Sequence, residues 1–145
     1  MGVFEKAVIS ADEITEFIPQ RAPIVMVDEF FGIDGNVSVS GLTIDGDNLF
    51  CEGELFSECG VVEHIAQSAA MRMGYIYKSQ NKEIPLGYIG SVNRFRIYDL
   101  PKVGERLRTE ITIEQQVMNI TLISAKVRIG QQLIAECQMK IYLQE

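Results

Sequence analysis

Three residues with acid–base or hydrogen-bonding side chains, Glu63, His64 and Gln67, lie close together near the middle of the chain. Glu63 can transfer a proton. Gln67, four residues later, shares a helix face with it and can orient the carboxylate or a water; the alternative is a solvated or sheet-capping glutamine. His64 points about 100° away around the helix, so a structural role, such as a hydrogen bond to Ser68, competes with one as a catalytic base. The group indicates proton-transfer chemistry centred on Glu63, with a plain surface glutamate as the alternative.

Four further residues are candidates for binding a substrate. Cys59 and Gly60 lie where this helix should begin, and Asn48 and Phe50 lie in the loop before it. A glycine lets a ligand approach the backbone closely, and the positive end of a helix stabilises a thiolate. The alternatives are an inert thiol, a packing glycine, a turn residue and a core aromatic residue.

The helix that must position these groups is indicated by apolar and small residues at helical spacing from Ser57, a candidate N-cap, to about Ser79. Its small central residues predict that a sheet wraps closely around it. We expect a short helical turn at 10–18, and strands at 24–33, 37–43, 86–97, 105–117, 120–129 and 133–143. This order predicts an α+β fold with one helix against an antiparallel sheet, in a single domain over residues 1–145.

Composition narrows the possible partners. The net charge is −7, which disfavours nucleic acid, because phosphate binding needs excess Lys and Arg. The chain lacks an apolar run long enough for a membrane helix, and residues 1–6 lack the apolar core of a signal peptide, so we expect no membrane and a cytoplasmic location. Cys51, Cys59 and Cys137 are odd in number and widely spaced, which argues for buried or semi-buried free thiols and against a zinc site. No metal and no cofactor are expected.

Four segments, in the same order along the chain, resemble the β-hydroxyacyl-acyl-carrier-protein dehydratases, which have the hot-dog fold. The first, Ile18-Pro19-Gln20-Arg21-Ala22-Pro23 followed by Met26-Val27-Asp28, is similar to their opening Leu-Pro-His-Arg motif. The others are Glu63-His64-Ile65-Ala66-Gln67, residues 89–95 and residues 101–105. The resemblance covers nearly the whole chain and implies a long central helix wrapped by a curled antiparallel sheet.

The chain also departs from this family. The dehydratases carry a catalytic histidine in a His-Phe-Pro-Gly segment before the helix, whereas residues 48–57 hold neither histidine nor proline, and Gln20 replaces the histidine of the opening motif. The shortened loop resembles the divergent dehydratase-like proteins of aryl-polyene pigment pathways. In the family, the resemblance implies, the loop histidine and the helix acid come from opposite subunits. His64, the only histidine, would have to turn into the site to replace the missing one.

The resemblance implies a carrier-bound or coenzyme A-bound substrate, and a cluster of arginines suits both. Arg94 and Arg96 share one face of their strand, and Arg106 and Arg108 share one face of the next. If these two strands pair as a hairpin, the four side chains form one basic patch that attracts an acidic carrier protein or the phosphates of coenzyme A. The alternative is an ordinary solvated face.

Three functions remain open. The first is a dehydratase-like lyase acting on 3-hydroxyacyl thioesters in fatty-acid, lipid or polyene biosynthesis. The second is an acyl thioesterase that uses the helix carboxylate. The third is a non-catalytic acyl-binding or pairing subunit that shares residues with a related hot-dog subunit in a heterodimer. In every case we expect at least a homodimer, because the strand at 86–97 would otherwise leave an exposed edge.

Overall fold

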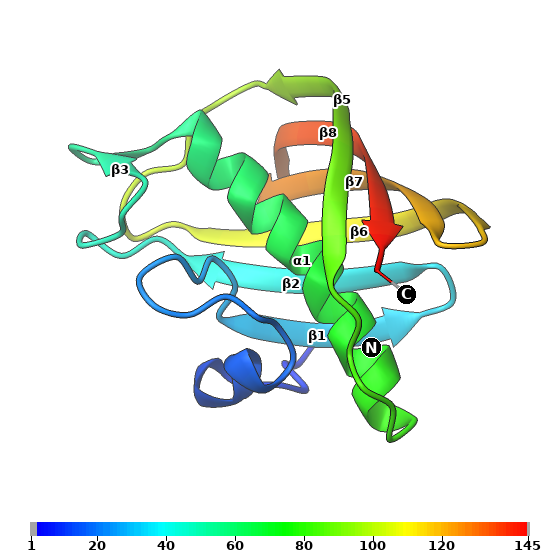
Figure 1. Ribbon diagram of the computed structural model, residues 1–145. Coiled ribbons are helices and arrows are strands. Elements are labelled where there is room, and N and C mark those ends of the chain that lie inside the picture. The colour runs from blue at the N-terminus through cyan, green and yellow to red at the C-terminus, as the bar shows by residue number, and fades with distance from the viewer. Residues whose placement is uncertain (1–2, 145) are drawn as a thin grey trace.

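A computed structural model describes residues 3–144, in which one long helix lies against a curled six-stranded antiparallel sheet (Figure 1). Met1, Gly2 and Glu145, which the predicted domain includes, lie outside the described residues. The helix is α1 (Glu58–Ser79), and a short 3-10 helix, η1 (Ala11–Glu16), lies near the N-terminus. The sheet contains β1 (Glu29–Asp34), β2 (Val37–Thr43), β5 (Gly87–Ile97), β6 (Arg106–Val117), β7 (Ile120–Ile129) and β8 (Gln132–Leu143), in the order β1-β2-β6-β7-β8-β5.

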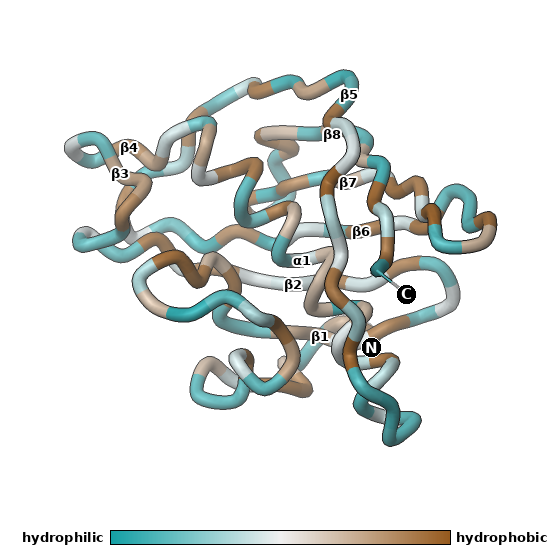
Figure 2. The backbone as a smooth tube through the Cα atoms, in the orientation of Figure 1, coloured by the Kyte–Doolittle hydropathy of each residue, from teal (hydrophilic) through white to brown (hydrophobic). Residues whose placement is uncertain are grey.

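Helix α1 begins where its sequence predicts. The Ser57 side chain accepts a hydrogen bond of 3.3 Å from the N–H of Gly60, which caps the first turn, and Glu58 and Lys78 complement the two ends of the helix dipole. Apolar and polar residues alternate around its turns (Figure 2). One face buries Val61 and Ile65 against the sheet, so packing against strands, in addition to local propensity, stabilises the helix.

A second, smaller apolar cluster lies on the other side of the helix. It joins the η1 segment and β1 to α1, and its buried members are Ile14, Phe17, Ile18, Val27, Phe30 and Met71. The chain passes so close to the helix here that a Cβ on Gly74 would lie 2.0 Å from the carbonyl oxygen of Phe17. Glycine at this position is therefore required by the approach of the η1 segment.

The predicted elements agree with the structure over most of the chain, with three differences. Residues 24–28 are not part of a strand, and β1 begins only at Glu29. The turn expected at 10–18 is the 3-10 helix η1. A small hairpin of β3 (Cys51–Glu52) and β4 (Leu55–Phe56), with Gly53 at φ +63° in its turn, was not predicted. Within residues 3–144, no helix is long and apolar enough to cross a membrane.

Candidate active site

Glu63 and Gln67 form a hydrogen-bonded pair on α1, as their spacing predicts. The Gln67 side chain is buried, and its Nε2 donates to Glu63 Oε2 at 2.7 Å and to the carbonyl of Ile24 at 2.8 Å. Its Oε1 accepts from the N–H of Met26 at 2.6 Å. Because an N–H can bond only to an acceptor, these three contacts fix the amide orientation. Gln67 thus holds the half-buried carboxylate of Glu63 in one place.

His64 lies on a different side of the helix and is fully buried. Its Nδ1 is 2.6 Å from the carbonyl oxygen of Met26, and its Nε2 is 2.7 Å from Thr109 Oγ1. A carbonyl can only accept, so Nδ1 carries the proton and Nε2 accepts from the Thr109 hydroxyl. Burial lowers the pKa of His64 to about 4, against the opposing effect of the Met26 bond.

These contacts assign His64 a structural role. Both ring nitrogens are occupied and the neutral ring is sealed from solvent, so it does not turn toward Glu63 to replace the missing loop histidine. The catalytic role considered for His64 is therefore wrong in this structure. The expected hydrogen bond to Ser68 is present, but it involves the backbone of His64: Ser68 Oγ donates to the His64 carbonyl at 2.7 Å, whereas Thr109 contacts the ring.

The peptide groups of Met26 explain why residues 24–28 are not a strand. Gln67 accepts from the Met26 N–H, and His64 donates to the Met26 carbonyl, so two side chains of α1 take the bonds that a neighbouring strand would have made. Asn48 Nδ2 adds a 3.4 Å contact to the sulfur of Met26. This segment consequently lies across the helix, next to Glu63.

Asn48, Phe50 and Gly60 make contacts within the protein. Asn48 Oδ1 accepts from the N–H of Phe50 at 2.8 Å, which is a turn contact. A Cβ on Gly60 would lie 2.6 Å from the ring of Phe56 and 2.7 Å from Cβ of Phe50. The glycine is therefore explained by two aromatic residues that cover the helix start. Its N–H is already donated to Ser57, which makes it a poor candidate for polarising a carbonyl.

The three cysteines are free thiols, as predicted, but Cys59 is exposed and the expectation that it would be buried or semi-buried is wrong. Cys59 is exposed in the first turn of α1, four residues before Glu63 and on the same helix face. Cys137 is buried in the core, where burial raises the pKa of its thiol to about 11. Cys51 is partly buried on β3, and desolvation raises the pKa of its thiol too. Of the three, only Cys59 therefore lies on the face that carries the acid.

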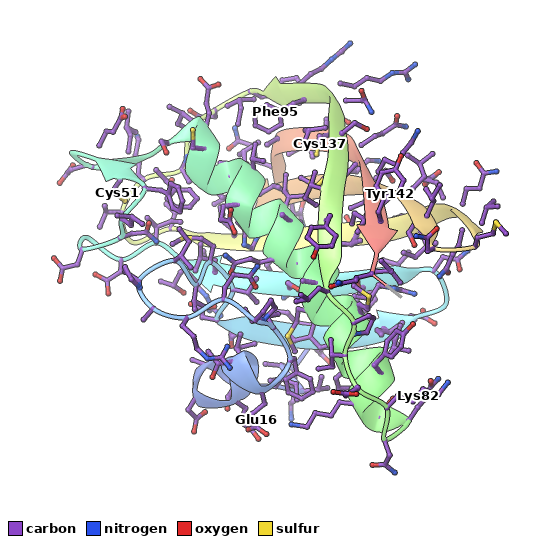
Figure 3. All side chains as sticks on the ribbon, viewed as in Figure 1. Glu16, Cys51, Lys82, Phe95, Cys137 and Tyr142 are labelled. Atoms are coloured by element: carbon purple, nitrogen blue, oxygen red, sulfur yellow. The ribbon has the colours of Figure 1, made fainter. Side chains whose placement is uncertain are left out.

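The four arginines do not form the single patch that we predicted. β5 pairs with β8 and β6 pairs with β2 and β7, so the strands that carry them are not neighbours. Arg106 forms an ion pair with Glu29 at 2.9 Å, and Arg108 stacks over the ring of Phe31. Arg94 and Arg96 remain exposed on β5, while the intervening Phe95 packs toward the core (Figure 3).

The edge of the sheet beside α1 is apolar and exposed. Among residues 3–144, β5 pairs on one side only. Its exposed residues include Tyr88, Ile89 and Val92, with 54 %, 43 % and 38 % of their surfaces accessible. A cavity of about 80 Å³ lies between this strand, the middle of α1 and the Pro19–Gln20 segment. Among its lining residues, Gln20 has a buried Oε1 without a hydrogen-bond partner in the described chain, and Ala66 lies one residue before Gln67.

Together, the curled sheet and the central helix define a hot-dog fold, with Glu63 as an acidic residue on the helix. The sequence profile of the ApeP-like family, described as ApeP dehydratase, matches residues 12–145. The chain belongs to this ApeP-like dehydratase family. The predicted resemblance, the hot-dog fold and the dehydratase class are thereby confirmed.

Individual relatives agree with this assignment. The 3-hydroxyacyl-acyl-carrier-protein dehydratase FabZ of Rickettsia typhi is 26 % identical over 145 residues, covering 95 % of this chain and 98 % of the relative. FabZ of Clostridioides difficile is 24 % identical over 143 residues, covering 94 % and 99 %. Among solved structures, the dehydratase heterocomplex ApeI:P from Xenorhabdus doucetiae has a similar fold, with a TM-score of 0.79, 15 % identity and 91 % coverage of both chains.

Sequence reasoning missed Thr109 and Met26 as residues that organise the site. Both contacts join His64 to residues about 40 positions away, so no local spacing reveals them. Thr109 did leave a weak signal, because it lies between Leu107 and Ile111 on the inward face of its strand. A hydroxyl at such a position needs a buried partner, and the chain's single histidine is the partner that it finds.

Proposed function

We propose that this protein dehydrates 3-hydroxyacyl thioesters carried on an acyl carrier protein or coenzyme A, with Glu63 as the acid–base residue that this chain contributes. The observation that carries the proposal is the 2.7 Å hydrogen bond from Gln67 to Glu63. It fixes the carboxylate, while the second oxygen, Oε1, accepts no hydrogen bond from residues 3–144 and stays available to a substrate. The FabZ relatives act on such substrates by name, which supports the same substrate class here.

The reaction needs two proton transfers. A base removes a proton from C2, an acid protonates the hydroxyl on C3, and the C3–O bond breaks as the C2=C3 double bond forms and water leaves. Glu63 can serve one of these steps. His64 cannot serve the other, since its ring is sealed between Met26 and Thr109.

We infer that the second group is a histidine supplied by a related hot-dog subunit. The resemblance to the dehydratase family implies that the loop histidine and the helix acid come from opposite subunits. A homodimer of this chain would bring two acids and no loop histidine to its interface. A heterodimer would complete at least one site, and the solved structure with a similar fold is itself described as a dehydratase heterocomplex.

The edge strand β5 is the proposed contact with that subunit. Tyr88, Ile89 and Val92 would be covered if the edge paired with a second sheet, which also satisfies its free backbone groups. Such a pairing would place the partner beside the small cavity lined by Gln20 and Ala66.

The thioester would lie along the face of α1 that bears Cys59 and Glu63. Substrate contact by Cys59 fits its exposure in the first turn, whereas Phe50 and Gly60 would shape the wall without touching the thioester. For the carrier, Arg94 and Arg96 are the remaining docking candidates. Both arginines precede the 98–105 connection. The Pro101 carbonyl in this connection accepts a hydrogen bond from the N–H of Phe56, just before α1. The arginines therefore lie toward the end of the molecule where α1 begins.

The reaction type is tested by following two products at once. Two samples are incubated with a 3-hydroxyacyl thioester. One is the chain alone, and the other is its purified complex with a hot-dog subunit that carries a loop histidine. Enoyl absorbance without free thiol is expected, and it should rise strongly in the complex. Free thiol without enoyl product would identify a thioesterase, and neither product from the complex at high enzyme concentration would refute the proposal.

A further inference from the structure

A larger cavity than the one beside β5 lies at the other end of α1 from Glu63. It has a volume of about 260 Å³ and lies between the C-terminal half of α1 and strands β6, β7 and β8. This is close to the lower end of ligand pockets, which run from roughly 300 to 1,000 Å³. Its wall is mainly apolar and includes Ala69, Met73, Ile111, Ile113, Ile123 and Ile141.

Arg72 gives this apolar cavity a positive charge. It is one of the lining residues, and only 9 % of its surface is exposed. Its Nη2 donates to the carbonyl of Gly35 at 3.1 Å, and its Nη1 donates to no acceptor within residues 3–144. Burial lowers the pKa of Arg72, and no carboxylate within residues 3–144 offsets this effect. A buried guanidinium without an anionic partner is unusual, because burying an unpaired charge is costly.

The other polar residues of the cavity point to an anion as well. Lys82, which follows the end of α1 (Figure 3), lies at the wall and is exposed, and no acidic residue is among the lining residues. The remaining polar lining residues, Tyr77, Gln80, Gln116 and Thr121, are neutral hydrogen-bonding groups. In a chain of net charge −7, a pocket with two cations and no carboxylate is a local exception.

We propose that this cavity binds a medium-chain organic carboxylate, with its apolar chain against the isoleucines and its carboxylate paired with Arg72. The site lies nine residues along the helix from Glu63, about 13 Å by helical rise, and neither Glu63 nor Gln67 is among its lining residues. It is therefore a second ligand site and does not depend on the proposed reaction. Such a ligand supplies what Arg72 lacks, an anion that accepts a charge-assisted hydrogen bond in a low-dielectric surrounding.

Octanoate is a suitable probe, with octanol and octylamine as matched molecules that lack the negative charge. Calorimetry with the full chain should show one octanoate site, and octanol and octylamine should bind at least about tenfold more weakly, as expected for the loss of one charge-assisted hydrogen bond. Equal binding of octanol, or no octanoate binding at millimolar concentration, would overturn the proposal without any variant being needed.

Variants then locate the site. Arg72→Met keeps an unbranched side chain and removes the charge, and it should weaken octanoate binding about tenfold while leaving octanol unaffected. Lys126→Met removes a charge from an exposed position of β7 outside the cavity and should change nothing. Ile113→Trp should fill the cavity and abolish binding of both molecules.

Glu63→Gln should bind octanoate normally, so the outcome is independent of the dehydratase proposal. Unchanged octanoate binding in both Arg72→Met and Ile113→Trp would refute this site.

Discussion

Glu63 and His64 adjoin in the sequence, but their side chains enter separate environments. The Glu63 carboxylate is half-buried and held by Gln67, while the His64 ring is fully buried between Met26 and Thr109. Gln67 and His64 nevertheless bind the same residue, since one accepts the N–H of Met26 and the other donates to its carbonyl. His64 thus helps to build the site by fixing the segment that faces Glu63.

Glu63→Gln should remove most of the dehydratase activity of the protein in its complex. The amide cannot exchange a proton as a carboxyl does, so the rate should fall by about 10²- to 10⁴-fold, the usual contribution of one acid–base group. Glu58→Gln, an exposed residue in the first turn of the same helix, is the matched control and should keep its rate. Initial rates of enoyl formation give the comparison, and full activity in Glu63→Gln would exclude this residue from catalysis.

His64 should make the protein less stable in mild acid. The unfolded histidine has a pKa of 6.5 and the folded one of about 4, so between these values only the unfolded chain binds the proton. Stability is therefore fully present above pH 6.5 and declines as the pH falls toward 4, by roughly 3 kcal/mol at most from this group. Urea denaturation across this pH range measures the decline.

The control for this effect is His64→Gln, which cannot titrate. At neutral pH it should be less stable by about 1–3 kcal/mol for each buried partner left without a hydrogen bond. Its stability should change less than that of the wild type between pH 6.5 and 4. Asp28, whose pKa is raised mainly by burial, contributes with the opposite sign in both proteins and cancels in the difference. Parallel pH curves for the two proteins would contradict the assignment of His64.

The sequence predicted elements well and contacts poorly. The helix from Ser57 to about Ser79 was clear, because its N-cap and its small and apolar residues act locally. The arginines show the limit of this reasoning. Their alternation along each strand correctly placed Arg94 and Arg96 on the exposed side. Strand order, however, depends on how the sheet curls around α1, and β5 pairs with β8 instead of β6. The Gln67–Glu63 bond followed from helical spacing, whereas Thr109 reaches His64 only through the tertiary fold.

Gly60→Ala should destabilise the protein although alanine favours helices. The added Cβ would meet the ring of Phe56 and the Cβ of Phe50 at 2.6–2.7 Å, and such overpacking costs about 1–3 kcal/mol. The gain in helix propensity is smaller, about 0.5–1 kcal/mol. Gly46→Ala, where the nearest atom would lie 3.8 Å away, is the control and should stay within about 0.5 kcal/mol of wild type in urea denaturation. Equal stabilities for the two variants would show that Phe50 and Phe56 can shift away from the added Cβ at little energetic cost.

The cysteines should differ in their reaction with a thiol reagent. Cys59 is exposed and should be labelled first in the folded protein, whereas Cys137 is buried, with a thiol pKa raised to about 11, and should react only after unfolding. Mass spectrometry of peptides after brief alkylation separates the sites, and denaturant provides the fully labelled reference. Early labelling of Cys137 would mean that β8 opens in the native state.

Ile89→Lys should disrupt the assembly that covers β5. Ile89 is an exposed apolar residue on the unpaired edge, and a lysine there adds a charge that opposes strand-to-strand pairing. Light scattering of the purified chain at micromolar concentration should report a dimer or larger assembly for the wild type and a smaller species for Ile89→Lys. Met118→Lys, at the exposed β6–β7 turn, makes the same chemical change away from this edge and should leave the assembly intact. If Met118→Lys dissociated the assembly and Ile89→Lys did not, the interface would lie at the β6–β7 turn, and the second catalytic group could not arrive beside Glu63 across β5.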